Sequence, residues 1–326
     1  MPVTLAQAKL NATDDIDTHV IDEFGKSSFL LSALTFDDVV NQAGAGATLT
    51  YGYTRLVSQA DAAFRALNSE YTPAEVTKQR YTVDLKPLGG SFQIDRVMNR
   101  IAAAAETTLQ MQQKVKATNA KFNDAVINGD TAVDANGFDG LSKSLTASST
   151  EYGASISTDW RGSALGADAG KANDALDALD AWLSMLDGTP DAILGNIDAI
   201  ARIRSLARRA GYFDRTEGAF GSRVESYRGI ALVDLGAKAG SNNLVIPTTS
   251  KTVATVAGNY TDIYAVRLGL DGFHAVSMAG TPLVQTWMPD FSTAGAVKTG
   301  EVELGPAAVV LKATKSAAVF RNILVR

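Results

Sequence analysis

The stretch from Asp95 to Asn128 predicts one very long helix, and this prediction constrains the fold more than any other feature of the chain. It reads DRVMNRIAAAAETTLQMQQKVKATNAKFNDAVIN, without proline or glycine. Apolar or small residues recur at steps of three and four, the period of one helix face: Val97, Ile101, Ala105, Thr108, Met111, Val115, Thr118, Phe122 and Val126. Asp95 is placed to cap the start, and Gly129 to end the helix. Such a helix spans about 50 Å, which favours a spine that other segments lie across.

Composition excludes several classes of protein. The chain has 326 residues, enough for two domains, and no cysteine, which excludes disulfide scaffolds, zinc–thiolate sites and cysteine nucleophiles. Only His19 and His274 could contribute to a multi-histidine metal site, and we expect no metal and no other cofactor. The net charge of −5 argues against electrostatic binding of nucleic acid by the whole chain. The first residues lack the pattern of a signal peptide, and no apolar run is long enough for a membrane span, so we expect a soluble protein made in a cytoplasm.

Residues 1–35 are predicted to form an arm of two short apolar pieces. Asp14, Asp15 and Asp17 begin the first piece, where helix capping explains them better than metal binding. Neither piece has enough apolar surface for a core of its own. Phe24 and Phe29 are therefore candidates for contacts with another subunit.

Residues 46–90 are predicted to form a projecting hairpin with a wide tip. Leu49, Tyr51 and Tyr53 lie at alternate positions on one face of the first strand. On the second strand, the residues from Thr77 to Lys86 point alternately to the two faces. A lone two-stranded hairpin is marginal in water. It either lies on its own domain or is completed by another copy of the chain, and we favour the second arrangement. The candidate interface residues are Tyr51, Tyr53, Phe64, Tyr71, Lys78, Arg80 and Tyr81, and Gly89 with Gly90 is the candidate loop hinge.

The second half of the chain predicts an α+β core. An amphipathic helix from Ala172 to Leu186, a buried strand AILG and a second helix capped by Asn196 follow one another, and several strand-like runs come after them. A sheet flanked by two helices is the natural assembly. Between the two halves, Asp134 and Asn136 are spaced wrongly for a calcium loop, so a turn is the better interpretation.

No motif supports catalysis. The phosphate-loop spacing fails at Gly25-Lys26-Ser27 and at Gly170-Lys171, and neither GxSxG nor HExxH occurs. The densest basic group is formed by Arg202, Arg204, Arg208 and Arg209. A solvated helix face explains it better than a nucleic-acid patch, and pairing with acids of a neighbouring subunit is a third possibility, which makes Arg202 and Arg209 interface candidates. The tyrosines of the hairpin fit strand packing or interface anchors better than base stacking. We expect a protein that is not an enzyme.

The order of these parts resembles the major capsid protein family of tailed bacteriophages, with its Hong Kong 97-type fold. An arm, a long hairpin, a spine helix, a mixed domain and terminal strands follow one another over nearly the whole chain. Individual strings also look like that family: FNDAVINGD followed by GFDGL, then YRGIALVDLG, TDIYAVRLGLDGFHAV, EVELGPAAVVLK and SAAVFRNILV.

The resemblance implies an α+β fold with named parts. Residues 1–35 would be the N-terminal arm, 46–90 the extended loop that overlaps a neighbour, 91–157 and 296–313 the peripheral domain with its spine helix at 95–128, and 158–295 with 314–326 the axial domain. Some members crosslink a loop lysine to an asparagine. Lys78 is the only lysine in the projecting part of the hairpin, but it has no identifiable asparagine partner, and no crosslink is predicted.

The resemblance also implies partners and a location. The chain would assemble with itself into pentamers and hexamers of a shell, together with portal and scaffolding proteins and a decoration protein. It would touch packaged double-stranded DNA weakly, avoid membranes, assemble in the host cytoplasm and reside in the virion. An encapsulin, the related bacterial compartment shell, is the alternative. A hydrolase-like enzyme using Asp or Ser with His274 is a third hypothesis, which the spacing of residues does not support.

Overall fold

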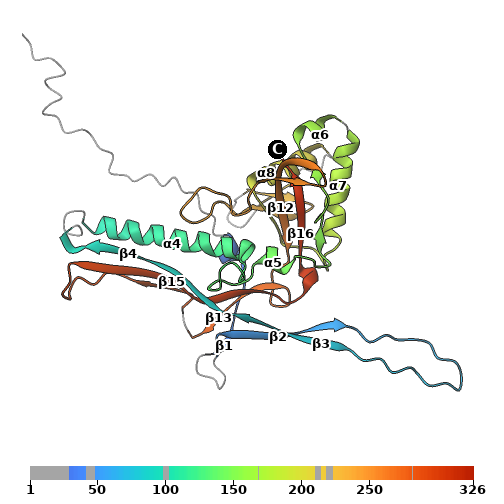
Figure 1. Cartoon of the computed structure of the whole chain (residues 1–326), viewed down its shortest axis with the longest axis horizontal. Coiled ribbons are helices and arrows are strands. Elements are labelled where there is room, and N and C mark those ends of the chain that lie inside the picture. Colours follow the sequence, from blue (N-terminus) through green and yellow to red (C-terminus); the bar gives the residue numbers. More distant parts are fainter. Residues whose placement is uncertain are drawn as a thin grey trace, which may run out of the picture.

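A computed structural model describes residues 29–41, 48–97, 103–167, 169–209, 214–217, 223–280 and 282–326. These residues form two sheets, a separate two-stranded ribbon and helices packed on both sheets (Figure 1). The predicted α+β class is confirmed. Phe24 and most of the predicted arm lie outside the described residues, and Phe29 begins the first described helix, α2 (Phe29–Ala33).

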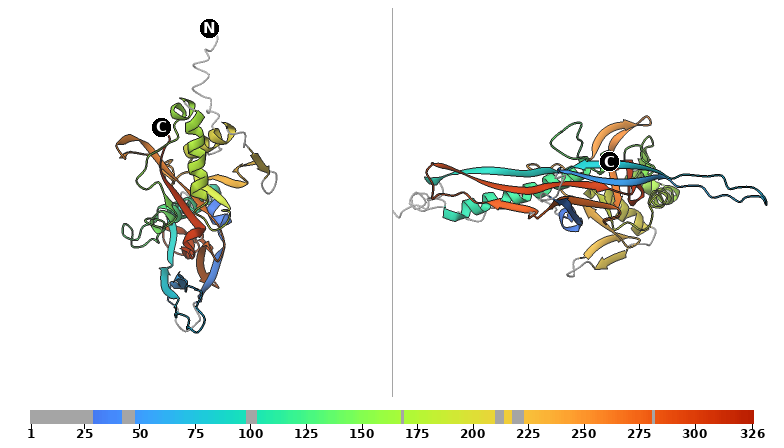
Figure 2. Two further views of the ribbon diagram at one scale, coloured as in Figure 1. Left: turned by 90° about the vertical axis from the view of Figure 1, so that its right-hand side faces the viewer. Right: turned by 90° about the horizontal axis from the view of Figure 1, so that it is seen from below.

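The first sheet is a long five-stranded layer. Its strands are β1 (Phe36–Asn41), β4 (Lys86–Asp95), β13 (Phe273–Ala279), β14 (Val284–Trp287) and β15 (Val297–Leu311). The long strand β15 pairs with β4 along one side and with β13 and β14 along the other, all antiparallel. Helix α4 (Ala103–Asn128) runs beside β4 and β15, so this part of the molecule is elongated (Figures 1 and 2).

Helix α4 confirms the predicted spine over most of its length. It has 26 described residues. The predicted apolar face is buried at Met111, Thr118, Phe122 and Val126. Toward the start the face is shifted by one position, because Thr107 is buried whereas Thr108 is exposed.

The two ends of the predicted spine have different backbone chemistry. Asp95 ends β4, and its carboxylate accepts a hydrogen bond from the Val97 amide at 2.7 Å, as expected of a cap. Residues 98–102 lie outside the described residues. Gly129 follows the helix as predicted, but its φ is not positive. Instead a Cβ there would meet the Phe138 carbonyl oxygen at 2.2 Å, so glycine is needed for a close backbone crossing.

The second sheet has nine strands, and its strand β7 (Ala192–Gly195) is buried on both faces. Its strands are β5 (Glu151–Tyr152), β6 (Thr158–Asp159), β7 (Ala192–Gly195), β8 (Asp214–Glu217), β9 (Arg223–Tyr227), β10 (Ile230–Asp234), β11 (Thr249–Val253), β12 (Val256–Val266) and β16 (Ala317–Leu324). In β7, Ile193 faces one hydrophobic cluster, while Ala192 and Leu194 face another. This explains why its sequence is a continuous apolar run rather than an alternating one.

Helices cover one face of this sheet, as the sequence predicted. They are α6 (Gly162–Ala167), α7 (Ala169–Leu183) and α8 (Ile197–Arg209). Asn196 caps α8 as predicted, because its Oδ1 accepts a hydrogen bond from the Ala199 amide at 2.8 Å. The predicted helix–strand–helix unit is therefore confirmed.

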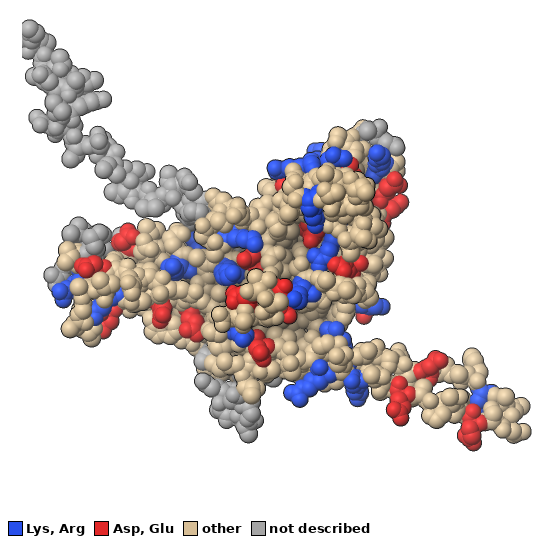
Figure 3. Space-filling view, in the orientation of Figure 1, with Lys and Arg blue, Asp and Glu red and all other residues tan. Residues whose placement is uncertain are grey.

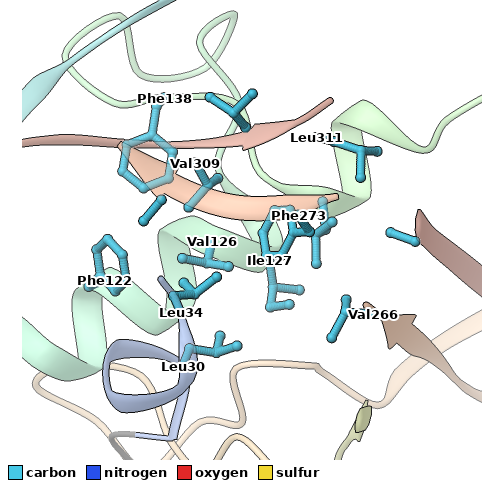
Figure 4. Packing of buried hydrophobic residues seen from close by; sticks show 14 of the residues in the cluster. Leu30, Leu34, Phe122, Val126, Ile127, Phe138, Val266, Phe273, Val309 and Leu311 are labelled. Atoms are coloured by element: carbon cyan, nitrogen blue, oxygen red, sulfur yellow. The ribbon is translucent and has the colours of Figure 1, made fainter. Parts of the chain in front are cut away.

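One hydrophobic core joins the two sheets. Phe122, Val126 and Ile127 of α4 converge with residues of β13, β15, β12 and the short helix α2 (Figure 4). The same cluster includes residues of β7 and β16 in the second sheet. Along the chain, the short helix α5 (Leu141–Ser144) precedes β5, and a 3-10 turn (Thr314–Ser316) connects β15 to β16. Because the two sheets share one hydrophobic core, we expect them to unfold together.

The strand pairing corrects the predicted domain boundaries. Residues 158–295 were predicted as one unit with 314–326, but β13 and β14 pair with β15 in the first sheet. Conversely, β5 at Glu151–Tyr152, predicted within 91–157, pairs with β16 in the second sheet. The reason is that β12 and β13 are consecutive in sequence yet enter different sheets. A short turn between two strand-like runs normally indicates a hairpin, so the pattern alone misplaces them.

A two-stranded ribbon projects from the first sheet. Strands β2 (Thr50–Ser58) and β3 (Thr77–Asp84) pair antiparallel, and residues 59–76 connect them. We call residues 50–84 the ribbon and residues 59–76 the ribbon tip. The ribbon extends away from the body (Figures 1 and 2), so the predicted projecting hairpin with a wide tip is confirmed.

The predicted hinge is corrected by the structure. Gly89 and Gly90 do not form a loop, because they lie inside β4 opposite Glu303 and Val302 of β15. A Cβ on Gly89 would lie 2.4 Å from the Val302 carbonyl oxygen. Glycine is required there because two backbones approach closely, a reason that the sequence cannot distinguish from flexibility.

This geometry predicts that Gly89→Ala destabilises the subunit. The contacting atoms are backbone and cannot move aside, so we expect a loss of about 2 kcal/mol in the free energy of unfolding. Gly90→Ala is the matched control, because its added Cβ would meet only the Lys114 side chain at 3.6 Å. Urea unfolding of both variants measures the difference, and equal stabilities would contradict the assignment.

Candidate assembly interface

The base of the ribbon is held on its own body by side chains of β2. The Tyr53 hydroxyl donates to the Leu311 carbonyl at 3.2 Å. Arg55 donates from Nε to the Lys312 carbonyl at 2.9 Å and from Nη2 to the Leu311 carbonyl at 2.6 Å, and its Nη1 donates to the Thr314 hydroxyl at 3.1 Å. Leu311 is the last residue of β15, and Lys312 follows it. The base therefore lies on its own domain, the arrangement that the sequence analysis did not favour for the hairpin as a whole.

Aromatic stacking continues this contact along one face of the ribbon. The rings of Tyr53 and Tyr81 stack with centroids 5.6 Å apart, and the Arg55 guanidinium lies 4.6 Å from the Tyr81 centroid. Burial raises the pKa of Tyr53 above 10.0, against the opposing effect of Arg55. The phenol therefore stays protonated and keeps its hydrogen bond at physiological pH.

The ribbon tip has no comparable support. Phe64 and Leu67 are fully exposed, at 108% and 93%, and Tyr71 is 65% exposed. Among the described residues, the only ring contact of Tyr71 is with the guanidinium of Arg65, whose Cζ lies 5.3 Å from the ring centroid. Large apolar side chains presented on a projection are typical of a surface that another molecule covers.

The tip also carries net negative charge. Asp61, Glu70 and Glu75 are acidic, and Arg65 is basic. Figure 3 shows acidic side chains along the outer part of the ribbon and basic side chains near its base. The docking surface for the tip is therefore expected to offer apolar contacts with positive charge at its rim.

Several predicted interface residues have partners inside the subunit. Tyr51 is 7% exposed and its hydroxyl donates to Asp37 at 3.3 Å, so it belongs to the core. Phe29 packs against the core that joins the sheets. Tyr53 and Tyr81 form the ribbon base described above. Tyr51 is therefore a core residue of the subunit, whereas Phe29, Tyr53 and Tyr81 are partly buried. A role for these residues in an interface stays a prediction.

The remaining candidates on the ribbon are exposed. Phe64, Tyr71, Lys78 and Arg80 all have exposed side chains. In Lys78 and Arg80 the side chains lie on the face opposite the tyrosines, as the alternation predicted. Their role in an interface stays a prediction.

Three of the four arginines of α8 also bond within the subunit. Arg202 donates to the Val325 carbonyl at 3.0 Å, and Arg209 donates to the Leu165 carbonyl. Arg204 pairs with Glu225 at 2.6 Å. These guanidinium groups connect α8 to α6, β9 and the end of β16 by hydrogen bonds and an ion pair. The helix face is therefore neither a free basic patch nor a fully solvated surface. An additional contact of Arg202 or Arg209 with a neighbour stays a prediction.

Arg55 and Leu67 were missed by sequence reasoning. Arg55 continues the Tyr51–Tyr53 alternation, so its position on the tyrosine face was readable from the spacing. Its three hydrogen bonds go to two carbonyls and one hydroxyl more than 250 residues away, which no local pattern indicates. Leu67 lies in the ribbon tip, where no periodic pattern marks it.

A cavity of about 540 Å³ lies beside the ribbon base. Its lining includes Tyr53, Tyr81, Asp84, Phe138 and Asp139. No histidine lines it, and within the described ranges no group of three or more His, Asp or Glu residues could hold a metal ion. His274 is fully buried and is not among the residues that line this cavity. Among the helices described, none is long and apolar enough to cross a membrane.

Comparison with solved structures decides the fold. No family model matches the sequence, and no curated protein does. The holo-SrpI encapsulin complex from Synechococcus elongatus matches with a TM-score of 0.63 and 15% identity, covering 100% of this chain and 97% of that one. Mycobacterium phage Bobi matches with a TM-score of 0.59 and 13% identity, covering 99% of both chains. The capsid of a native GTA particle matches with a TM-score of 0.57 and 12% identity, covering 97% of both.

The chain has the Hong Kong 97-type capsid fold. The predicted fold family is therefore confirmed over nearly the whole length. In the terms of that fold, α4 is the spine helix and the ribbon is the extended loop. The neighbours named here are capsids and an encapsulin, and at 12–15% identity they establish the fold of this chain.

Proposed function

We propose that this chain is a self-assembling shell protein, the major capsid protein of a tailed phage. The observation that carries the proposal is the ribbon tip, whose phenylalanine and leucine are fully exposed on a projection of an otherwise well-packed subunit. A subunit with such a projection makes heterologous contacts, in which the tip of one copy lies on a different surface of the next. Heterologous contacts that close form rings, and rings with small angular variation form shells.

The parts of the fold have distinct roles in this proposal. The first sheet with α4, including β13 and β14, is the peripheral domain, and the second sheet with α6, α7 and α8 is the axial domain around five-fold and six-fold axes. The ribbon overlaps the peripheral domain of a neighbour, and the arm of residues 1–35 makes further contacts between subunits. The shared core connects the two domains within each subunit.

The virion assignment adds a genome and partners to this shell. Pentamers and hexamers form an icosahedral container for double-stranded DNA, assembled in the host cytoplasm with portal and scaffolding proteins and a decoration protein. A net charge of −5 suits a container that must let DNA slide rather than bind it tightly. The function is structural, without catalysis.

An encapsulin-type compartment shell is the second candidate, because an encapsulin complex matches with a TM-score of 0.63, above the 0.54 to 0.59 of the capsids compared. Both candidates use the same fold and both require a closed shell. They differ in what the shell encloses.

The test has two stages. Expression of the full chain followed by negative-stain electron microscopy is expected to give closed particles, and a stable monomer at high concentration would refute both candidates. Particles isolated from the producing cells are then treated with nuclease. Protected double-stranded DNA supports the phage assignment, whereas particles that hold a protein cargo and no DNA overturn it in favour of the compartment.

A further inference from the structure

A buried histidine lies under the base of the ribbon without a hydrogen-bond partner. His274 of β13 is 0% exposed, and neither Nδ1 nor Nε2 has a partner. Its ring makes an edge-to-face contact with Tyr51 of β2, with centroids 6.2 Å apart. A buried imidazole that stabilises the fold usually donates or accepts at least one hydrogen bond.

One carboxylate oxygen next to this histidine is shared by three groups. Asp37 Oδ2 accepts a hydrogen bond from the Tyr51 hydroxyl at 3.3 Å. It lies 3.9 Å from Lys312 Nζ and 4.0 Å from His274 Nε2. These groups come from four different segments, and Tyr51 is the member that belongs to the ribbon. Lys312 also lies 5.5 Å from the Tyr51 centroid, so the lysine and the carboxylate together hold the tyrosine.

The surroundings keep His274 neutral at neutral pH. Burial lowers its pKa below 6.5, and the positive charge of Lys312 lowers it further. Asp37, Asp271 and the backbone of Gly272 act in the opposite direction without reversing the shift. The packed arrangement around His274 favours the neutral imidazole, so its stability is fully present above pH 6.5. This stability is lost as the pH falls from 6.5 through the lowered pKa, because the imidazole binds a proton more readily once the cluster has opened.

We propose that this cluster is an acid-released latch for the ribbon base. Protonation of His274 places a second positive charge beside Lys312 in a buried site and gives Nε2 a proton to donate to Asp37. The Asp37 carboxylate turns toward the imidazolium and leaves the Tyr51 hydroxyl, which removes one of the contacts that hold the base of β2 and loosens it, while the hydrogen bonds of Tyr53 and Arg55 remain. The proton comes from solvent, and no covalent bond changes. The latch is a property of the single subunit and does not depend on the proposed shell.

Two measurements on the full chain test the latch. The chain has only two histidines, so His19→Gln leaves one imidazole signal, whose titration by NMR reports His274 directly. Hydrogen exchange of residues 50–58, corrected for intrinsic rates, reports release of β2. Between pH 7.5 and 5 we expect protection to fall by up to about ten-fold per pH unit below the ordinary pKa.

The variants separate the latch from general acid instability. His274→Phe keeps a buried ring without a titrating group, and protection of residues 50–58 should then be nearly independent of pH, while His19→Gln should behave like the original chain. The same acid-induced loss in His274→Phe would overturn the proposal. If that variant does not fold, the NMR titration still decides, because a His274 signal that does not titrate while β2 loses protection also overturns it.

Discussion

Closed shells are expected to disappear when the ribbon tip is replaced by an Asn-Gly turn. Ser58 and Thr77 are paired across the ribbon, so two residues between them complete a tight hairpin of the type that Asn-Gly favours. Because Tyr53, Arg55 and Tyr81 remain, the base stays on the body and the subunit should keep its fold. The apolar anchors Phe64, Leu67 and Tyr71 are lost together.

Electron microscopy and size-exclusion chromatography measure the outcome. The shortened chain should elute as free subunits or small oligomers, with a circular dichroism spectrum and an unfolding midpoint close to those of the full chain at matched concentration. Phe64→Ser should weaken assembly in the same direction, whereas Thr72→Ala, at an exposed polar position of the tip, should leave it unchanged. Normal shells from the shortened chain would refute the role of the tip.

Arg321→Ala is expected to have the largest effect on stability. The Arg321 side chain is 16% exposed and pairs with Glu151, which is 10% exposed, and with Asp262 at 3.3 Å. It also donates to the Ser142 carbonyl at 2.8 Å and to the Thr146 hydroxyl at 3.1 Å. This one side chain therefore connects β16, β12 and β5 to the segment around α5.

Removal of the arginine leaves two partly buried carboxylates without their partner, which typically costs about 3–5 kcal/mol. Arg326→Ala is the matched control, because Arg326 also pairs with a carboxylate, Asp198 at 2.6 Å, but its side chain is 64% exposed. An exposed pair contributes less than about 1 kcal/mol. Urea unfolding at one protein concentration compares them, and similar losses in the two variants would contradict this difference.

The sequence predicted features that depend on local periodicity. The spine face from Met111 to Val126, the cap at Asn196 and the alternating ribbon strands follow from residues within a few positions of one another. The projecting ribbon was also predictable, because neither of its strands has enough apolar residues for a buried face.

The features that sequence reasoning missed depend on distant backbone. Gly89 is needed because β15 passes close to it, and Arg55 is placed by carbonyls at Leu311 and Lys312. The assignment of β13 to the first sheet depends on its pairing with β1 and β15, which no local pattern contains. The same limit explains Tyr51 and Phe29, whose burial is provided by residues far along the chain.

The position of β15 and β16 has a consequence for synthesis of the protein. These two strands follow all the others in sequence, yet β15 pairs with β4, β13 and β14, and β16 pairs with β5, β6 and β12. Neither core can close while the ribosome is still translating the residues before Val297. A chain that lacks these strands therefore has no completed body on which the ribbon of another copy could lie, and we expect such incomplete polypeptides to be excluded from the proposed shell.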